Sequence, residues 1–409
     1  MTRTRRIVIV TETFHPEVGG GETQARTMAD AFIARGHEVV IVTRRSRPEL
    51  PRRQSMGHLD VIRIGPQGPG RWKKWGLLAN AFPAIHSAAR DADVVLVSGF
   101  RILGLPAVLA SRLRGVPCLL KGDSRGEMSG DFFRAGVATI GLTPRSLPVR
   151  AFVALRNVVL RRATRFVALS SEMRSEFIAS GVPAERVVVI PNGVEVERFR
   201  PAGDDERRAL RHKLDWPDGF VAVYTGRLVT YKGLPLLLRT WASMQHDDER
   251  ATLVLVGTGG GDMHACEDQL RAFVRENRLE EQIQFAGSVP DVADYLRAAD
   301  LFVFPTLEEA FGLSLVEAMA CGLPVVSTSV GGIRDFLSDG VNGLEVPPDD
   351  GDALRRALHR LMTNATDRER LGRGAHDTAA SRFSQDVVAD AWISLFDSVA
   401  IRPDQRVAT

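Results

Sequence analysis

Short apolar runs of β-type residues alternate with segments of helical periodicity along most of the chain. Ile7–Thr11 is the first such run, and Val39–Thr43 is the next, after a helical segment at Thr23–Arg35 that ends at Gly36. Strands without apolar–polar alternation, separated by helices, are typical of a parallel sheet covered on both faces. Further strands of this type are predicted at Val61–Ile64, Val94–Ser98, Cys118–Lys121, Phe166–Leu169 and Val187–Ile190.

The second half of the chain repeats this alternation after an interruption. Residues 195–219 are highly charged and have no strong apolar period, so we expect 198–219 to be a linker. The predicted domains are then 1–197 and 220–384, and a last helix in 385–409 is expected to pack back toward the first domain. The fold class that follows is α/β, with two Rossmann-like, doubly wound parallel-sheet domains facing a cleft. Strands of the second domain are predicted at 220–225, 252–256, 283–286, 301–304, 325–327 and 344–346.

Composition excludes several classes of protein. The 409 residues are 44% hydrophobic and 25% charged, which is an ordinary globular balance and argues against disorder or a disulfide scaffold. The net charge of +3 is too small to indicate nucleic-acid binding. Cys118, Cys266 and Cys321 stand far apart, so a zinc site is not expected and a reducing compartment fits best. With no signal segment and no apolar stretch long enough to span a membrane, we expect a cytoplasmic protein.

The segment 304–324 (FPTLEEAFGLSLVEAMACGLP) carries the densest chemistry. A predicted strand ends at Phe304, and a helix begins near Gly312, so the amides of 310–313 are expected to point out of a helix start, where an anion is stabilised. Glu309 lies beside these amides, and Glu317 lies within the helix. Two carboxylates around an anion site suit a ligand with both phosphate and hydroxyl groups. The alternative is that Glu309 merely interacts with the helix dipole and Glu317 is solvated; the strand–loop–helix context favours a ligand.

A second candidate site is 224–234 (YTGRLVTYKGL), directly after a predicted strand. Arg227 and Lys232 are a pair of cations suited to a diphosphate, since arginine is a bidentate donor and lysine a point charge. The alternative is a surface turn with incidental charges. The chain has only five lysines, and Lys232 precedes a glycine, which favours a function for it.

Three consecutive glycines, Gly19, Gly20 and Gly21, follow the first strand and let the backbone approach a ligand closely. Their surroundings do not match the dinucleotide fingerprint G-x-G-x-x-G. The segment 256–262 (VGTGGGD) also fails that fingerprint, because its sixth position is Asp262. Asp91 and Asp93 precede a strand rather than follow one, so no metal site is predicted.

Taken together, these segments resemble glycosyltransferase family 4, the retaining glycosyl transferases of group 1 with the GT-B fold. EEAFGLSLVEAMACGLPVV is similar to the family signature, and GRLVTYKG to its phosphate-binding element. PEVGGGETQARTMADAFIARGHEVVIVT resembles its amino-terminal loop and helix. VVVIPNGVEVERFRP resembles the end of its first domain, and VGGIRDFLSDGVNGLEVPPDD a later donor-domain segment. Five motifs in the family's order cover nearly the whole chain.

The resemblance implies roles for individual residues. Arg227 and Lys232 would hold the donor diphosphate, Glu309 the hydroxyls of the transferred sugar, and Glu317 the ribose hydroxyls. The amides of Phe311, Gly312 and Leu313 would bind sugar and phosphate. Gly19–Gly21 would close over the phosphate, and Val289 would lie near the base. The family needs no metal or other cofactor, and its leaving diphosphate helps to deprotonate the acceptor on the same face of the sugar.

One position departs from the family. Many members carry a histidine after the strand equivalent to Cys118–Lys121, whereas this chain has LLKGDSRGEMSGDFF there. Either Lys121 or Asp123 substitutes for it, or the histidine is dispensable. His15, in the glycine loop, is a weaker candidate.

Two basic segments suggest a membrane contact. Residues 66–75 form a basic loop with tryptophans, and 148–165 is an arginine-rich amphipathic segment with Val149, Phe152, Val153, Val159 and Ala163 on its apolar side. An interfacial contact with anionic lipid is one interpretation. The other, which we favour slightly, is a helix packed on the sheet with a solvated basic face.

The function predicted from the sequence is transfer of a sugar, with retention, from a UDP- or GDP-sugar to a hydroxyl of a glycan, a lipid-linked acceptor or a small molecule. The alternatives are another GT-B sugar-nucleotide enzyme, such as an epimerase, and a non-catalytic sugar-nucleotide-binding protein.

Overall fold

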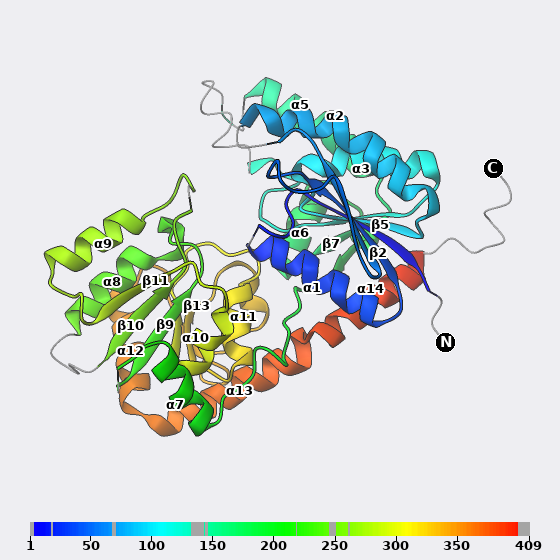
Figure 1. Ribbon diagram of the computed structural model, residues 1–409. Helices are drawn as coiled ribbons and strands as arrows, with labels where there is room; N and C mark the ends of the chain where they lie inside the picture. The colour runs from blue at the N-terminus through cyan, green and yellow to red at the C-terminus, as the bar shows by residue number, and fades with distance from the viewer. Residues whose placement is uncertain are drawn as a thin grey trace. The chain divides into compact units, whose positions relative to one another are not determined.

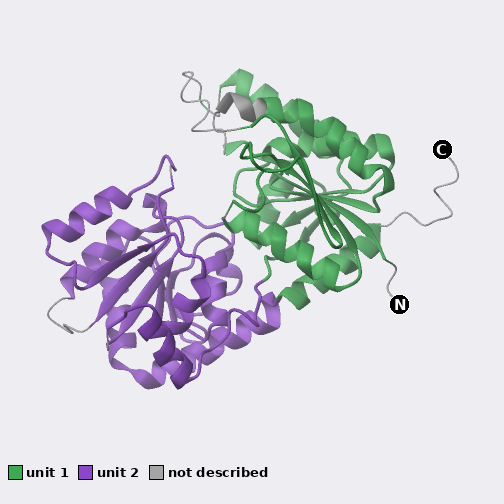
Figure 2. Cartoon of the chain, viewed as in Figure 1, with its two compact units in different colours: residues 1–193, 385–409 green, residues 194–384 purple. Residues whose placement is uncertain are grey.

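The chain folds into two compact units, shown in different colours in Figure 2. Unit 1 comprises Met1–Gly193 with Gln385–Thr409, and unit 2 comprises Val194–Ser384. The computed structural model describes residues 4–17, 19–67, 71–131, 143, 146–217, 219–244, 251–260 and 262–399, with the backbone alone for 71–75. Each unit is a largely parallel sheet with helices, so the predicted fold class of two parallel-sheet α/β domains is confirmed.

The sheet of unit 1 has the strand order β3-β4-β2-β1-β5-β6-β7-β8. Neighbouring strands run parallel, except that β3 pairs antiparallel with β4 at the edge. The short β3 was not predicted, because its polar sequence RQSM has no apolar face. The strands are β1 (Arg6–Thr11), β2 (Glu38–Arg44), β3 (Arg53–Met56), β4 (Leu59–Ile64), β5 (Val94–Ser98), β6 (Cys118–Lys121), β7 (Arg165–Ala168) and β8 (Val187–Val189).

Helices cover this sheet and include the last helix of the chain, α14 (Gln385–Val399), which lies beside α1 (Gly20–Ala34) in Figure 1. The rings of Phe32 and Phe396 meet edge to face with centroids 5.3 Å apart, and Arg35 pairs with Asp390 at 2.9 Å. Apolar burial and ion pairs thus bind α14 to unit 1. Among the described residues, the other α-helices of this unit are α2 (Arg71–Ala88), α3 (Phe100–Arg114), α5 (Leu147–Leu160) and α6 (Ser171–Ala179).

Helix α5 turns polar side chains inward. Arg156 and Asn157 are buried, and Asn157 donates to the Met128 carbonyl at 2.8 Å. The prediction that Phe152 lies on a packed apolar side is wrong, since that ring is 43% exposed. The reason is that Arg156 and Asn157 find hydrogen-bond acceptors in the loop after β6. Among the described residues, no helix is long and apolar enough to cross a membrane.

Unit 2 has the strand order β11-β10-β9-β12-β13-β14, with every neighbouring pair parallel. Its strands are β9 (Val221–Thr225), β10 (Thr252–Val256), β11 (Ile283–Gly287), β12 (Leu301–Phe304), β13 (Val325–Thr328) and β14 (Leu344–Val346). Its helices are α7 (Asp204–Lys213), α8 (Leu234–Ser243), α9 (Glu267–Glu276), α10 (Val292–Ala298), α11 (Leu313–Ala320), α12 (Gly351–Thr363) and α13 (Ala365–Phe383).

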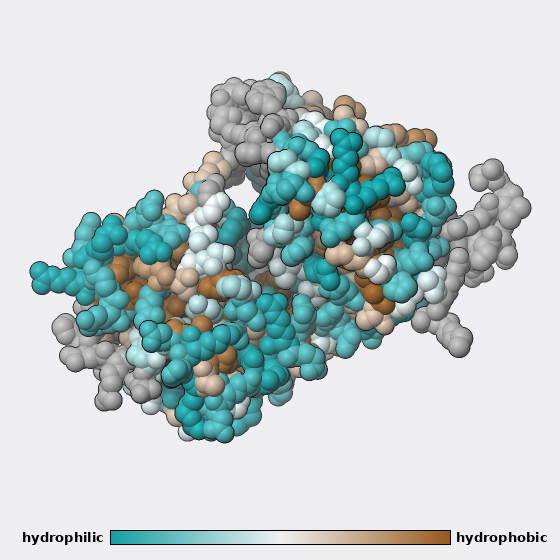
Figure 3. Space-filling model, in the orientation of Figure 1, coloured by the Kyte–Doolittle hydropathy of each residue, from teal (hydrophilic) through white to brown (hydrophobic). Residues whose placement is uncertain are grey.

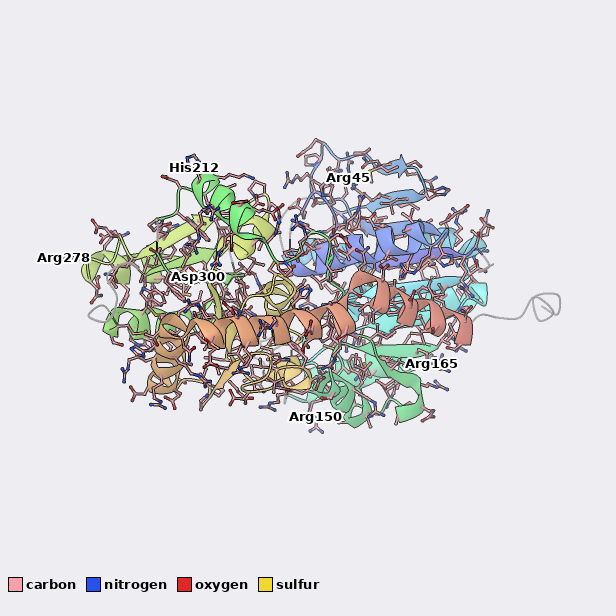
Figure 4. All side chains as sticks on the ribbon, turned by 90° about the horizontal axis from the view of Figure 1, so that it is seen from below. Arg45, Arg150, Arg165, His212, Arg278 and Asp300 are labelled. Atoms are coloured by element: carbon pink, nitrogen blue, oxygen red, sulfur yellow. The ribbon has the colours of Figure 1, made fainter. Side chains whose placement is uncertain are left out.

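The predicted linker 198–219 needs correction, because its centre is helix α7 and belongs to unit 2. Charged contacts anchor this helix: Arg207 and Arg211 both pair with Asp300, which lies just before β12, and Arg211 does so at 2.5 Å. Figure 4 shows Asp300 close to the helix that carries His212. Only Leu210 of α7 is buried, so the helix has no apolar stripe that sequence periodicity could detect.

Candidate functional site

The strand order in the sheet of unit 2 reverses between β9 and β12, which makes this position a topological switch point. The chain builds outward from β9 through β10 to β11, then returns to the other side of β9 and continues with β12, β13 and β14. In open parallel sheets, ligands bind outside the carboxyl ends of the strands at such a switch point. The loops that follow β9 and β12 are the segments around Arg227–Lys232 and Glu309, so the topology brings the two strongest sequence candidates together.

Lys232 and Glu309 form an ion pair across this switch point. The lysine is held by the 3-10 turn at Thr230–Lys232, and its ammonium lies 5.0 Å from the centroid of the Phe304 ring, at the end of β12. The side chains of Lys232 and Glu309 are 12% and 15% exposed. Both remain accessible from solvent, but their charges are partly desolvated, which strengthens their interaction with each other and with any ion that replaces either one.

Arg227 is in a different environment from Lys232. Its side chain is 62% exposed and pairs with Asp262, and it donates to the Tyr231 hydroxyl at 2.6 Å. Asp262 belongs to the VGTGGGD segment after β10, which matched no ligand fingerprint. The pairing of Asp262 with Arg227 leaves no signal in the sequence, because the two residues are 35 positions apart.

The helix start that was predicted near Gly312 is present. Gly312 precedes α11 with φ = 98°, a left-handed conformation that favours glycine, and Leu313 is the first helical residue. The first amides of a helix have no acceptor within it, and its N-terminal end carries partial positive charge. Glu309 accepts a hydrogen bond from the Ala310 amide at 3.1 Å, so a carboxylate already lies beside this start.

A pair of glycines after β13, Gly331 and Gly332, packs against the Glu309 loop. A Cβ on Gly331 would lie 1.7 Å from the Glu309 carbonyl oxygen, and one on Gly332 would lie 2.4 Å from the Ala310 carbonyl oxygen. The turn after β13 therefore packs directly against the backbone that carries Glu309. This contact explains why the VGGIRD segment contains two glycines.

Glu317 lies on α11 and faces the segment that contains Arg198. Burial raises the pKa of Glu317 to about 8; nearby Arg198 acts in the opposite direction, and Glu195 adds to the increase. The side chain of Glu317 is only partly buried, so its carboxyl group remains accessible to a ligand. Val289 lies in the loop between β11 and α10, two residues before Asp291, which pairs with Arg198 at 2.8 Å.

Unit 1 has its own switch point, between β1 and β5, and three predicted residues lie there. Gly19 precedes α1, whereas Gly20 and Gly21 are its first two residues, so the helix begins three residues before Thr23, where the sequence predicted it. A Cβ on Gly19 would lie 2.5 Å from an oxygen of Glu22, whose carboxylate also accepts a hydrogen bond from Thr13. Apart from its chain neighbours and its own helix backbone, nothing lies within 4 Å of a Cβ position on Gly20, so backbone at the start of α1 is open to a ligand.

Lys121, the last residue of β6, and Asp123, two residues after it, lie at the same edge of unit 1. Lys121 is 1% exposed and pairs with Asp123, whose other oxygen accepts from the Ser98 hydroxyl at 2.8 Å. That second oxygen lies 4.0 Å from the Cβ position of Gly21. Because Lys121 is buried, the group that a ligand can reach is Asp123, a distinction that sequence alone left open. Within the described residues, no three His, Cys, Asp or Glu side chains are grouped to hold a metal ion.

Comparisons with known proteins match both units. Residues 19–193 match the model of a glycosyl transferase 4-like domain, and residues 219–364 match that of glycosyl transferases group 1. D-inositol 3-phosphate glycosyltransferase 1 of Catenulispora acidiphila is 31% identical over 394 residues, covering 93% of this chain and 91% of that protein.

Solved structures show the same architecture. Sucrose-phosphate synthase of Thermosynechococcus elongatus superposes with a TM-score of 0.79 at 23% identity, covering 97% of this chain and 99% of that one. Anabaena HepE in complex with UDP-glucose does so with a TM-score of 0.76 at 20% identity, covering 97% and 100%. At these identities the likeness shows the fold.

Proposed function

The chain belongs to glycosyltransferase family 4, so it transfers a sugar from a nucleotide-sugar donor with retention, and we propose that the donor binds to unit 2 at the switch point between β9 and β12. The observation that carries this proposal is the Lys232–Glu309 pair, which joins a cation and a carboxylate from opposite sides of that point. A sugar nucleotide offers the matching groups, a diphosphate and a set of hydroxyls.

On donor binding, Lys232 exchanges Glu309 for the diphosphate, and Glu309 turns to the hydroxyls of the transferred sugar. Arg227 and the amides of Phe311, Gly312 and Leu313 contribute further positive potential. Glu317 takes the ribose hydroxyls, for which its partly exposed carboxyl group is available. In this arrangement Val289 lies near the base, and Gly19–Gly21 approach the phosphate with open backbone.

The charges fit the chemistry of transfer. When the bond between the sugar C1 and the diphosphate oxygen breaks, negative charge gathers on the leaving diphosphate, where Lys232 and the start of α11 stabilise it. The acceptor oxygen bonds to C1 on the same face, and its proton passes to a diphosphate oxygen. No step requires a metal, and we expect turnover to be unchanged by EDTA.

For the substrates, the relatives suggest where to begin. HepE is described with UDP-glucose, which makes UDP-sugars the first donors to test before GDP-sugars. The relative from Catenulispora acidiphila is named for inositol 3-phosphate, so a small polyol or its phosphate is the first acceptor class to test before glycans and lipid-linked acceptors. We propose that Asp123 orients the acceptor hydroxyl.

The test combines binding and turnover. UDP, GDP and ADP are compared by calorimetry, and release of nucleoside diphosphate is measured with a panel of acceptors. A transferase yields a new glycoside with the anomeric configuration of the donor, which NMR detects. An epimerase would interconvert sugar nucleotides without an acceptor, and a binding protein would gain thermal stability from the donor with no turnover. Either result would overturn the proposal.

A specific observation on unit 1 favours a second proposal, a peripheral contact with an anionic membrane in the cytoplasm. The outward face of α5 presents Leu147 and Leu155, which are 79% and 70% exposed, together with Phe152 and Val158. In Figure 3, brown and tan atoms lie along the upper edge of unit 1, where Figure 1 shows α2, α3 and α5. Exposed Arg150, labelled in Figure 4, and Arg162 flank this face. An apolar helix face with flanking arginines suits the interface of an anionic bilayer.

Co-sedimentation with phosphatidylglycerol vesicles tests this contact. We expect binding that decreases with salt and is weaker to phosphatidylcholine vesicles. Leu155→Ser should weaken it, whereas Val341→Ser, which changes a similarly exposed residue of unit 2, should not. Binding that ignores salt and lipid charge, or equal losses in both variants, would contradict the contact.

A further inference from the structure

Glu127 is a completely buried carboxylate in the loop after β6 of unit 1. One of its oxygens accepts from the Phe100 amide, the first residue of α3, at 2.9 Å. The other accepts from the Asp123 amide at 2.9 Å, from the Ser124 amide at 3.0 Å and from the Ser124 hydroxyl at 3.1 Å. This single group therefore ties the start of α3 to the turn that carries Asp123.

Other contacts also restrain the turn that carries Asp123. Ser98, at the end of β5, holds one oxygen of Asp123, and Lys121 holds the other. A Cβ on Gly99, the residue before α3, would lie 3.1 Å from Asp123 Oδ2. The backbone and the side chain of Asp123 are thus fixed by separate contacts, and the backbone contact is Glu127.

We propose that Glu127 is a positioning residue for transfer: its ionised carboxylate holds the 123–124 turn so that Asp123 faces the acceptor, and protonation of Glu127 slows the reaction. This inference rests on the proposed role of Asp123. Glu127 itself is buried and touches no substrate, so it acts through Asp123.

The groups around Glu127 allow its carboxyl group to gain or lose a proton near neutral pH. Burial, together with the negative charge of Asp123, raises the pKa of Glu127 to about 7, while Arg101 on α3 and the Asp123 and Ser124 amides act in the opposite direction. From α5, Arg156 donates to the Glu127 carbonyl and is attracted by both Glu127 and Glu176 of α6; Lys121 of β6 acts through Asp123. Below the pKa, one oxygen of Glu127 carries a proton and no longer accepts as before, so the turn loosens as pH falls.

The chain contains a matched control on α6. Glu176 accepts from the amides of Gly126, Met128 and Ser129 at 2.9, 3.1 and 3.2 Å, whereas the amides of Asp123 and Ser124 donate to Glu127. Glu176→Gln therefore disturbs the same loop through a similar carboxylate without releasing the Asp123 turn.

The experiment measures kcat and KM of the full-length enzyme between pH 5.5 and 9 for wild type, Glu127→Gln, Glu176→Gln and Asp123→Asn. We expect wild-type kcat to fall on the acid side with a midpoint near 7. Glu127→Gln should lower kcat roughly tenfold at pH 8 and should abolish this decrease of kcat at low pH, the acid limb of the profile. Its donor KM and thermal stability should be retained. Glu176→Gln should keep the acid limb.

Wild-type kcat in Glu127→Gln, an acid limb that persists in it, or an equal loss of kcat and thermal stability in both glutamine variants would overturn the inference. If Asp123→Asn loses turnover while Glu127→Gln does not, the inference fails and the role of Asp123 stands. If Asp123→Asn turns over like wild type, the role of Asp123 fails and the inference fails with it.

Discussion

The two switch points of this protein contain the same pair of groups, a lysine and a carboxylate, in different environments. In unit 2, Lys232 and Glu309 are both partly exposed and come from two different loops. In unit 1, Lys121 is buried and pairs with Asp123, only two residues away in sequence. A ligand phosphate can therefore compete for Lys232 but not for Lys121. Equivalent topology thus leaves the lysine accessible in one unit, and the carboxylate but not the lysine accessible in the other.

The largest effect is expected for Lys232→Ala. If Lys232 faces the leaving diphosphate, as we propose, removing this cation should lower kcat/KM for the donor about 10²–10³-fold. The measurement is release of nucleoside diphosphate under initial-rate conditions, with the thermal unfolding transition as the control for folding. Wild-type turnover in this variant would contradict the proposed diphosphate site of unit 2, and the two switch points would then not differ in this way.

Asp123→Asn tests the other half of the comparison. The amide keeps the shape of the side chain but removes its charge, and we expect kcat to fall about 10²-fold. Donor binding, measured by calorimetry with the nucleoside diphosphate, should be unchanged. A loss of donor affinity in place of kcat would mean that the carboxylate of unit 1 serves the donor.

A smaller effect is expected for Arg227→Ala. Arg227 is mostly exposed and already paired with Asp262, so its contribution to the diphosphate is screened by water. We expect roughly a tenfold increase in donor KM. Asp262→Asn is the matching variant, since it frees Arg227 and should not weaken the donor. A larger loss for Arg227→Ala than for Lys232→Ala would reverse the ranking of the two cations.

The smallest effect is one of stability. Because the pKa of Glu317 is raised to about 8 in the folded protein, this acid ionises earlier in the unfolded chain, and the free energy of unfolding falls as pH rises from about 4.5 to 8. Glu317→Gln removes this loss. Allowing for the partial exposure of the side chain, we expect a gain of about 1–2 kcal/mol at pH 8.5 and none at pH 4.5, with weaker donor binding.

Unfolding transitions of wild type and Glu317→Gln at the two pH values check this prediction. An equal stability difference at both pH values would show that Glu317 does not titrate between them. Together with unchanged donor binding, that result would leave Glu317 as a solvated helix residue, the alternative raised from the sequence.

Local sequence determined much of the fold. The apolar runs became β1, β2, β4 to β8 and β9 to β14, because a strand buried on both faces needs apolar residues wherever it lies. The glycine-bearing segments after β1, β9 and β12 likewise took their predicted places at strand ends. The parallel topology then carries Lys232 and Glu309 to one switch point, although they are 77 residues apart.

Only the tertiary structure decided how the polar groups pair. Helix α7 depends on Asp300, about 90 residues away, Arg227 on Asp262, and the inward turn of Arg156 on the loop after β6. Such partners leave no period in the sequence, since a charged residue has the same local pattern whether it is solvated or paired. The burial of Lys121 belongs to the same class: the sequence offered Lys121 and Asp123 as equals, and packing around β6 left only Asp123 within reach of a ligand.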